Sequence, residues 1–268
     1  MTHATVKPQS SSAQKTLLQI SNLSVRFGGL TALSRFNFSL DSGELVGLIG
    51  PNGAGKTTAF NVVTGVYAPS EGAVLLAGIQ LAGRKPYRTN RLGVARTFQN
   101  IRLFGGLSVL DNVIVAFGQS LKHGFADVVL RTPRATRQER QCEEQAMDLL
   151  KTFALDDRAD APASSLAYGQ QRRLEIARAL ATGPKVLLLD EPAAGMNPQE
   201  KRELMDLIRF IRDRFSLGIW LIEHDMQLVM GICERITVLD HGETIAVGTA
   251  QEVQNDQKVI DAYLGVEE

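Results

Sequence analysis

Apolar and polar positions change their spacing several times along the chain, and the order of these changes predicts an α/β fold. Residues 17–40 alternate at period two, which is typical of strands with one buried face. Uninterrupted apolar runs at 45–49, 186–189 and 218–222 are typical of strands buried in a parallel sheet. Helical patterns at 56–64 and 199–215 follow such runs. We expect a mostly parallel core sheet with helices, and an antiparallel β addition at the N-terminal side.

The middle of the chain reads differently, because its apolar residues recur at helical spacing. Ala146, Leu149, Leu150 and Phe153 form one such stripe, and 170–181 predicts a further helix. We therefore predict an α-helical subdomain at about 105–180 within a domain that spans 17–265. Residues 1–16 are polar and rich in Ser, Thr and Gln, and we expect them to form a disordered tail.

Composition narrows the classes of function. The 268 residues are 44% hydrophobic and 22% charged, as in ordinary globular domains. The formal net charge is +0, so no overall field favours nucleic acid or an anionic membrane. A spanning helix needs about 20 mostly apolar residues, and no run in the chain meets this. We expect no nucleic-acid partner, and a membrane role only through other subunits.

A glycine-rich turn between a predicted strand and a predicted helix gives the first chemical signal. Residues 50–57 fit the pattern G-x-x-x-x-G-K-[ST] in the context that this motif requires. Backbone N–H groups at a helix N-terminus bind oligophosphates, and glycines leave room for this approach. Lys56 is suited to the β- and γ-phosphates of ATP, and Thr57 to Mg²⁺. The residues that we assign to ATP binding here are Gly50, Pro51, Asn52, Gly53, Ala54, Gly55, Lys56, Thr57 and Thr58.

Two adjacent acids end the buried run at 186–189. Asp190 is suited to Mg²⁺, and Glu191 to orienting the water that attacks the γ-phosphate. Adjacent acids at a strand end are also typical of a solvated turn, but parallel strands bring their carboxyl ends to the same edge of a sheet. His224 follows the run at 219–222, so the same argument makes it a donor to the γ-phosphate. A histidine at such a position is equally typical of a structural role.

Together with these motifs, further segments resemble the ATP-binding subunits of ABC transporters. Gln99 matches the glutamine of the family's Q-loop, Phe27 matches the aromatic residue that stacks on adenine, and residues 194–197 match the D-loop. The signature segment of the family is matched by Leu166, Ala167, Tyr168, Gly169 and Gln170. The resemblance implies a P-loop NTPase fold and an ABC ATPase domain over 17–265. It also implies catalytic roles for Glu191, His224 and Gln99, and Mg²⁺ contacts from Thr57, Gln99 and Asp190.

The resemblance also implies an assembly. Two such domains enclose two ATP molecules, each between one chain's phosphate loop and the other's signature, and drive transmembrane permease subunits. The chain is then a peripheral protein at the cytoplasmic face of the inner membrane. Its second ATPase subunit is a different chain or an identical one, and an external substrate-binding protein takes part indirectly.

A narrower resemblance concerns residues 168–178, 190–198 and 262–265, which are similar to the branched-chain amino acid uptake ATPases. Alternatives are a lipopolysaccharide-export ATPase, which is a homodimer, and another ABC import motor. A soluble ABC ATPase acting on ribosomes or DNA usually has two cassettes or a long coiled-coil insertion, and neither is seen in this sequence. A purely nucleotide-binding regulator is disfavoured by Glu191.

Two further expectations concern particular positions. Ala167 replaces the usual serine of the signature, and Tyr168 the usual glycine. This removes a hydroxyl that caps a helix and contacts the γ-phosphate of the partner's ATP. We also expect the surface around Phe98, Leu103 and Phe104 to receive a short helix from a permease.

Overall fold

The computed structural model describes residues 16–118 and 133–264. The expected disordered tail, 1–16, lies outside these residues except for Thr16, which begins the first strand. Gly265, the last residue of the expected domain, also lies outside them.

The larger of two sheets forms the centre of the fold, with the strand order β10-β9-β3-β8-β7-β6. Its strands are β3 (Leu45–Ile49), β6 (Val94–Arg96), β7 (Val186–Asp190), β8 (Gly218–Ile222), β9 (Arg235–Asp240) and β10 (Glu243–Gly248). Every neighbouring pair is parallel except β9 and β10. Every residue of β3, β7 and β8 is buried, which explains their uninterrupted apolar runs. The mostly parallel core is confirmed.

The register of this sheet sets the position of the candidate site. Ile222, the last residue of β8, pairs with both Leu48 of β3 and Asp190 of β7. The three strands therefore end side by side, and the segments that follow them begin at one edge. These segments carry the phosphate loop, Glu191 and His224.

The N-terminal strands form a second, antiparallel sheet, as predicted. Its order is β2-β1-β4-β5, made of β1 (Thr16–Phe27), β2 (Leu30–Asp41), β4 (Glu71–Leu76) and β5 (Ile79–Gln80). A buried aromatic cluster joins it to the core sheet: the Trp220 ring of β8 stacks on Phe38, with 4.0 Å between centroids, and also contacts Phe36 and Phe60. Helix α1 (Lys56–Val63) packs into this same core through Phe60 and its neighbours. The helix is thereby fixed between the two sheets.

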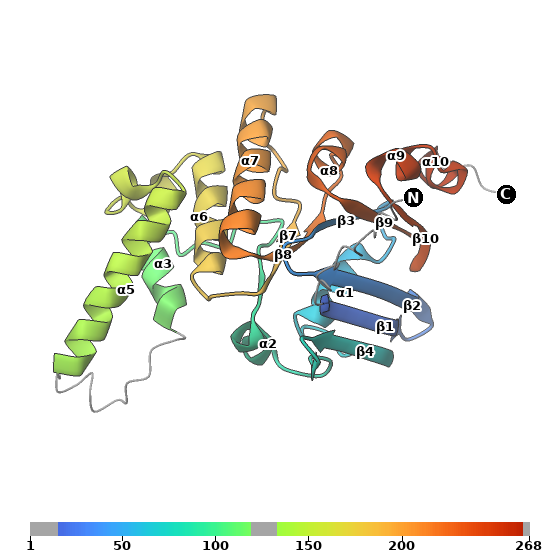
Figure 1. The fold of residues 1–268 in the computed structure, drawn as a ribbon, viewed down its shortest axis with the longest axis horizontal. Coiled ribbons are helices and arrows are strands. Elements are labelled where there is room, and N and C mark those ends of the chain that lie inside the picture. Colours follow the sequence, from blue (N-terminus) through green and yellow to red (C-terminus); the bar gives the residue numbers. More distant parts are fainter. Residues whose placement is uncertain (1–15, 119–132, 265–268) are drawn as a thin grey trace, which may run out of the picture.

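Helices cover the rest of the core sheet and one end of the molecule (Figure 1). α7 (Pro198–Phe215) and α8 (Met226–Ile232) pack against the face opposite α1. The short helix α2 (Pro86–Leu92) follows β5, and α9 (Ala250–Gln254) and α10 (Gln257–Leu264) follow β10 in turn. No described helix is long and apolar enough to cross a bilayer.

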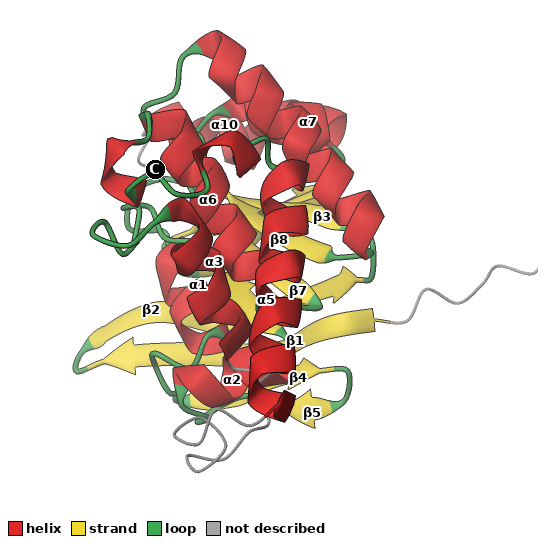
Figure 2. Cartoon of the chain, turned by 90° about the vertical axis from the view of Figure 1, so that its left-hand side faces the viewer, coloured by secondary structure: helices red, strands yellow, loops and turns green. Residues whose placement is uncertain are grey.

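The segment predicted to be a helical subdomain contains α3 (Val109–Phe117), α5 (Pro133–Thr152), α6 (Tyr168–Leu180) and the single turns η2 (Asp156–Arg158) and η3 (Ala163–Ser165). α3, α5 and α6 stand together at one end of the molecule (Figures 1 and 2). The predicted stripe is buried there, with Ala146, Leu149 and Leu150 in α5 and Phe153 directly after it. The limits 105–180 stay a prediction.

One helix begins earlier than its sequence pattern suggested. α6 starts at Tyr168, two residues before the expected start at 170. Ala167 is extended, and its N–H donates to the Gln170 side chain at 3.3 Å. Gln170 thereby satisfies one backbone group at the helix start, where alanine offers no acceptor of its own.

Candidate nucleotide-binding site

The phosphate loop joins the end of β3 to the start of α1. The cap residue of α1, Gly55, makes no side-chain capping bond, and the first helical turn holds no acid. The backbone N–H groups of this turn are therefore available to an anion, which the helix dipole also favours.

The structure adds a second reason for two of the three glycines in this loop. A Cβ on Gly50 would lie 2.0 Å from the Leu239 carbonyl oxygen, and one on Gly55 would lie 2.5 Å from that of Ala32. Both positions need glycine because neighbouring backbone approaches too closely. Only at Gly53 would a Cβ point into open space, so there the φ of +85° and the approach of a phosphate remain as reasons.

Lys56 closes the loop onto itself. Its Nζ donates to the carbonyl oxygens of Gly50 and Pro51, at 2.6 and 2.8 Å, and the residue is 6% exposed. Burial lowers the pKa of the Lys56 ammonium, while the negative charges of Glu191 and Asp190 oppose this effect. The ammonium of Lys56 is thus held by two uncharged carbonyl groups. No carboxylate among the described residues is in direct contact with it, so its charge is available to an anionic ligand.

Glu191 lies in a backbone conformation that non-glycine residues rarely adopt. Its φ is +46°, and its N–H donates to the Ile222 carbonyl oxygen at 2.9 Å. Strained residues of this kind persist where the surrounding structure holds them, and they cluster at functional sites. The turn after Asp190 therefore aims the Glu191 side chain at the end of β8.

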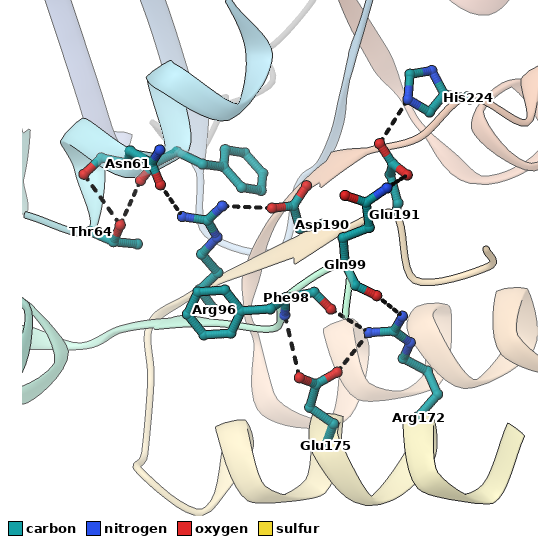
Figure 3. Close-up of polar contacts among 11 residues, drawn as sticks. Asn61, Thr64, Arg96, Phe98, Gln99, Arg172, Glu175, Asp190, Glu191 and His224 are labelled. Carbon is teal, nitrogen blue, oxygen red and sulfur yellow. Dashed lines mark hydrogen bonds and ion pairs between the residues drawn. The ribbon is translucent and has the colours of Figure 1, made fainter. Parts of the chain in front are cut away.

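The other two predicted catalytic residues, Gln99 and His224, contact this side chain (Figure 3). Gln99 Nε2 donates to Glu191 Oε2 at 2.7 Å, and His224 Nε2 lies 2.7 Å from Glu191 Oε1. Each carboxylate oxygen still has a lone pair, so the group can accept a proton from a water molecule. The sequence placed Gln99 here only by its resemblance to the Q-loop.

A cavity of about 390 Å³ lies over the phosphate loop. The predicted site residues that line this cavity are Phe27, Asn52, Gly53, Ala54, Gly55, Lys56, Thr57, Thr58, Glu191 and His224. Leu30, Thr31, Ala32 and His241 complete it, and none of these four was predicted. Phe27 is 45% exposed, and the Tyr67 ring meets it edge to face at 5.2 Å between centroids. A flat aromatic face at the end of the cavity suits a nucleobase.

The signature segment lies elsewhere. None of its residues lines the cavity over the phosphate loop. Ala167, Gly169 and Gln170 line a separate cavity of about 250 Å³ beside α7. Ala167 and Tyr168 are exposed at the start of α6, and no side chain caps that helix through its first N–H groups. The two halves of the predicted site are therefore apart within one chain.

Two buried ion pairs hold the backbone and side chains of the site in place. Sequence reasoning predicted neither pair. Arg172 and Glu175 of α6 form a buried ion pair at 2.6 Å. Arg172 donates to the carbonyl oxygens of Phe98 and Gln99, while Glu175 accepts the Phe98 N–H. The backbone around Gln99 is thus fixed to the signature helix. The second pair joins Arg96 to Asp190 at 2.6 Å, and both side chains are buried.

Glu223 is a further residue that the sequence analysis did not single out. It is 3% exposed and precedes His224. Its carboxylate accepts the Ala193 N–H at 2.7 Å and the His224 N–H at 3.1 Å, so it joins the segment after Glu191 to the segment that carries the histidine. Burial raises the pKa of Glu223, and these backbone donors oppose the rise.

The residues predicted to bind magnesium fit that ion by their chemistry. Thr57, Gln99 and Asp190 offer a hydroxyl, a carboxamide and a carboxylate oxygen, the ligand types that Mg²⁺ prefers. Gln99 uses its amide nitrogen for Glu191, which leaves its oxygen for a cation. No group of three or more His, Cys, Asp or Glu side chains suited to a metal occurs in the part of the chain that the structure describes. Few protein ligands suit Mg²⁺ when substrate phosphates supply the others.

The fold and the loop define a P-loop nucleotide-binding cassette, and comparisons with known proteins agree. A family model described as ABC transporter matches residues 33–194, and one described as Branched-chain amino acid ATP-binding cassette transporter matches 243–268. The Escherichia coli K12 high-affinity branched-chain amino acid transport ATP-binding protein LivG is 48% identical over 93% of this chain and 98% of its own length. The lipopolysaccharide export system ATP-binding protein LptB of the same organism is 33% identical over 92% of this chain and 97% of its own length.

A solved structure gives the same result. The ADP conformation of an ATP-binding cassette of an ABC transporter has a TM-score of 0.81 and 28% identity, and covers 93% of this chain and 99% of its own. The chain belongs to the ABC transporter family, as one of its ATP-binding cassettes. The predicted fold class and family are confirmed.

Proposed function

We propose that this chain hydrolyses Mg-ATP at a site completed by a second ATPase subunit, and that this reaction powers uptake of branched-chain amino acids. The observation that carries the proposal is the cluster of Glu191, Gln99 and His224 beside the cavity of the phosphate loop. A carboxylate, an amide and an imidazole converge there within hydrogen-bond distance of one another. This is the geometry that positioning and deprotonating a water molecule requires.

The proposal gives each residue a role that its position supports. Lys56 and the N–H groups at the start of α1 bind the phosphates, and the Phe27 ring stacks on the base. Glu191 orients the attacking water and accepts its proton. His224, 43% exposed at the rim of the cavity, donates to the γ-phosphate. Thr57, Gln99 and Asp190 would hold Mg²⁺, which would supply positive charge to neutralise the phosphates.

A second subunit supplies the missing half. The signature of this chain lines a separate cavity and not its own nucleotide cavity. It would therefore serve ATP on a partner chain, and the partner's signature would serve ATP here. Gly169 and the N–H groups at the start of α6 remain for a phosphate, although Ala167 brings no hydroxyl. The partner is a different ATPase subunit or a second copy.

The permease docks on the helical side of Gln99. A groove of about 280 Å³ lies there between the Arg96 strand and the helices, and the exposed Phe104 and Val115 border it. The expected docking surface changes in one respect. Leu103 packs against the helical core, and Phe98 is half-buried between arginines, so Phe104 is the exposed residue of the three. Exposed apolar side chains beside a groove suit a short amphipathic helix.

The cargo is inferred from relatives, because a motor domain does not contact it. The chain is more similar to LivG than to LptB, 48% against 33% identity, and its last residues match the branched-chain amino acid family model. An external binding protein would deliver the amino acid to the permeases. The chain would act at the cytoplasmic face of the inner membrane as a peripheral subunit.

The test is uptake by the reconstituted transporter. Proteoliposomes with the permeases, both ATPase subunits and the binding protein should accumulate labelled leucine when ATP is enclosed on the ATPase side. Glu191→Gln in this chain should abolish accumulation, and labelled lysine serves as the control substrate. ATP hydrolysis without leucine uptake would reject the cargo. Extraction of lipopolysaccharide by the same chain as a homodimer would support the export alternative instead.

A further inference from the structure

Arg96 is a charged residue near the site whose side chain is nearly buried and which the proposed mechanism does not use. It ends β6, the edge strand of the core sheet, three residues before Gln99. One guanidinium nitrogen donates to Asp190 Oδ2 at 2.6 Å, and another donates to Asn61 Oδ1 at 2.7 Å (Figure 3). The side chains of Arg96 and Asp190 are only 6% and 7% exposed.

The surroundings suit the planar guanidinium of an arginine better than the ammonium of a lysine. The guanidinium lies 5.4 Å from the centroid of the Phe60 ring and 5.0 Å from that of Phe98. A planar, forked group satisfies two acceptors in such a slot, whereas the single ammonium of a lysine does not match this geometry. A buried ion pair is weak evidence for stability, since burial of two charges costs about as much as their attraction returns. The pair therefore needs a reason other than stability.

The contacts place Arg96 between the parts that would hold a metal ion. Asn61 belongs to α1, the helix that begins with Lys56 and Thr57. Asp190 ends β7 and precedes Glu191. Arg96 donates to Oδ2 of Asp190, and this bond fixes the orientation of the carboxylate and therefore the position of Oδ1. Carboxylates that bind metals are usually held by hydrogen bonds from a second residue, and losing that residue typically costs 10–100-fold in metal affinity.

We infer that Arg96 is a positioning residue that holds the Asp190 carboxylate in the orientation for Mg²⁺ and fixes it relative to helix α1 through Asn61. This inference rests on the proposed function, because it takes Asp190 as a metal ligand. Arg96 itself touches neither the nucleotide nor the metal. Its effect is confined to the magnesium-dependent part of nucleotide binding.

The experiment measures binding of a fluorescent, non-hydrolysable ATP analogue to the full chain as Mg²⁺ is titrated, and again in EDTA. In Arg96→Gln, the Mg²⁺ concentration for half-maximal binding should rise about tenfold, while affinity in EDTA stays within about twofold. Asn61→Ala should shift the same quantity in the same direction but less, because the Arg96–Asp190 bond remains. Arg140→Gln, which removes an exposed helix pair with Glu144, should change neither.

Other outcomes separate this inference from the proposal beneath it. Equal losses with and without Mg²⁺ in Arg96→Gln, accompanied by a lower Tm, would mean a merely structural role and overturn it. If Arg96→Gln does not fold, an unchanged Mg²⁺ dependence in Asn61→Ala overturns it. Asp190→Asn should shift the Mg²⁺ dependence, and Arg96→Gln should add nothing in that background. A shift in Asp190→Asn without one in Arg96→Gln defeats this inference alone. No shift in Asp190→Asn defeats the metal role of Asp190 as well.

Discussion

The phosphate-loop end and the signature end of this chain differ in how far their polar groups are already arranged. At the phosphate loop, Lys56 is almost fully buried with two acceptors, and Glu191 has a partner on each oxygen. At the signature, Ala167 and Tyr168 are exposed, and the helix start has no side-chain cap for its first N–H groups. The catalytic half is thus preorganised within one chain, while the signature half presents an open surface. This difference supports the proposal that one chain holds half of each of two sites.

Among the variants considered, Glu191→Gln should have the largest effect, because it removes the carboxylate at the preorganised phosphate-loop end. We expect ATP turnover to fall by about 10²–10⁴-fold, because the general base is lost while the shape of the side chain is kept. ATP binding should be nearly unchanged. Steady-state phosphate release and equilibrium nucleotide binding check the two parts. Glu71→Gln, at an exposed acid, is the control, and near-normal turnover in Glu191→Gln would remove Glu191 from the mechanism.

Lys56→Ala should act on binding instead of turnover alone. The variant removes a charged donor to the phosphates and leaves the carbonyl oxygens of Gly50 and Pro51 without their partner. Hydrogen bonds to charged groups contribute about 1.5–3 kcal/mol, so we expect the ATP dissociation constant to rise by roughly 10–100-fold. Isothermal titration measures it, with ADP as a comparison. Tight ATP binding by this variant would show that the loop binds phosphate through its backbone alone.

A smaller effect is expected at the base end of the cavity. Phe27→Ala should raise the dissociation constant for ATP by about fivefold, since stacking on one aromatic ring contributes about 1 kcal/mol. The loss should be similar for GTP, because stacking reads the face of a base more than its edges. Competition between the two nucleotides on one fluorescent probe measures this. An unchanged constant for both would reject the stacking role of Phe27.

The smallest effect concerns the open end. Ala167→Ser would add a cap to α6 and a hydroxyl for the partner's γ-phosphate, and one hydrogen bond of about 0.5–1 kcal/mol predicts a two- to fivefold faster turnover there. The measurement is single-site turnover in an assembled complex whose other site is disabled. Ala167→Gly is the matched variant without a hydroxyl. No gain from serine would mean that the two ends do not differ in the way proposed.

The same two ends show what the sequence can reveal. The sequence predicted Glu191 and His224 near the phosphate loop because parallel strands end at one edge, and both residues line the cavity there. The sequence analysis did not identify Arg96, because a charged residue on a short edge strand has the pattern of a solvated residue. Its ion-pair partner, Asp190, lies 94 positions away in the sequence. Arg172 and Glu175 have the spacing of a surface helix pair. Only the backbone around Gln99, packed over them, makes them a buried clamp.

The two missed pairs also share a physical reason. Hydrophobic periodicity identifies apolar residues that face a core, but a buried charge interrupts that pattern and gains its partners from distant segments. Gly50 and Gly55 illustrate the converse, since the motif identified them for the approach of a ligand whereas neighbouring backbone also requires them. Local patterns therefore predicted which residues surround the site better than they predicted what holds these residues in place.

The central claim, that one chain carries two incomplete halves, is tested most directly by association that depends on ATP. Sedimentation velocity of the Glu191→Gln chain should be measured with and without Mg-ATP, both alone and mixed with the second ATPase subunit of the same transporter. We predict that a two-chain species forms only with ATP, either in the chain alone or in its mixture with the second subunit. This species should be lost when Lys56→Ala is combined with Glu191→Gln. If the chain binds ATP with full affinity but sediments as a single subunit in both samples, the proposal of two incomplete halves is contradicted.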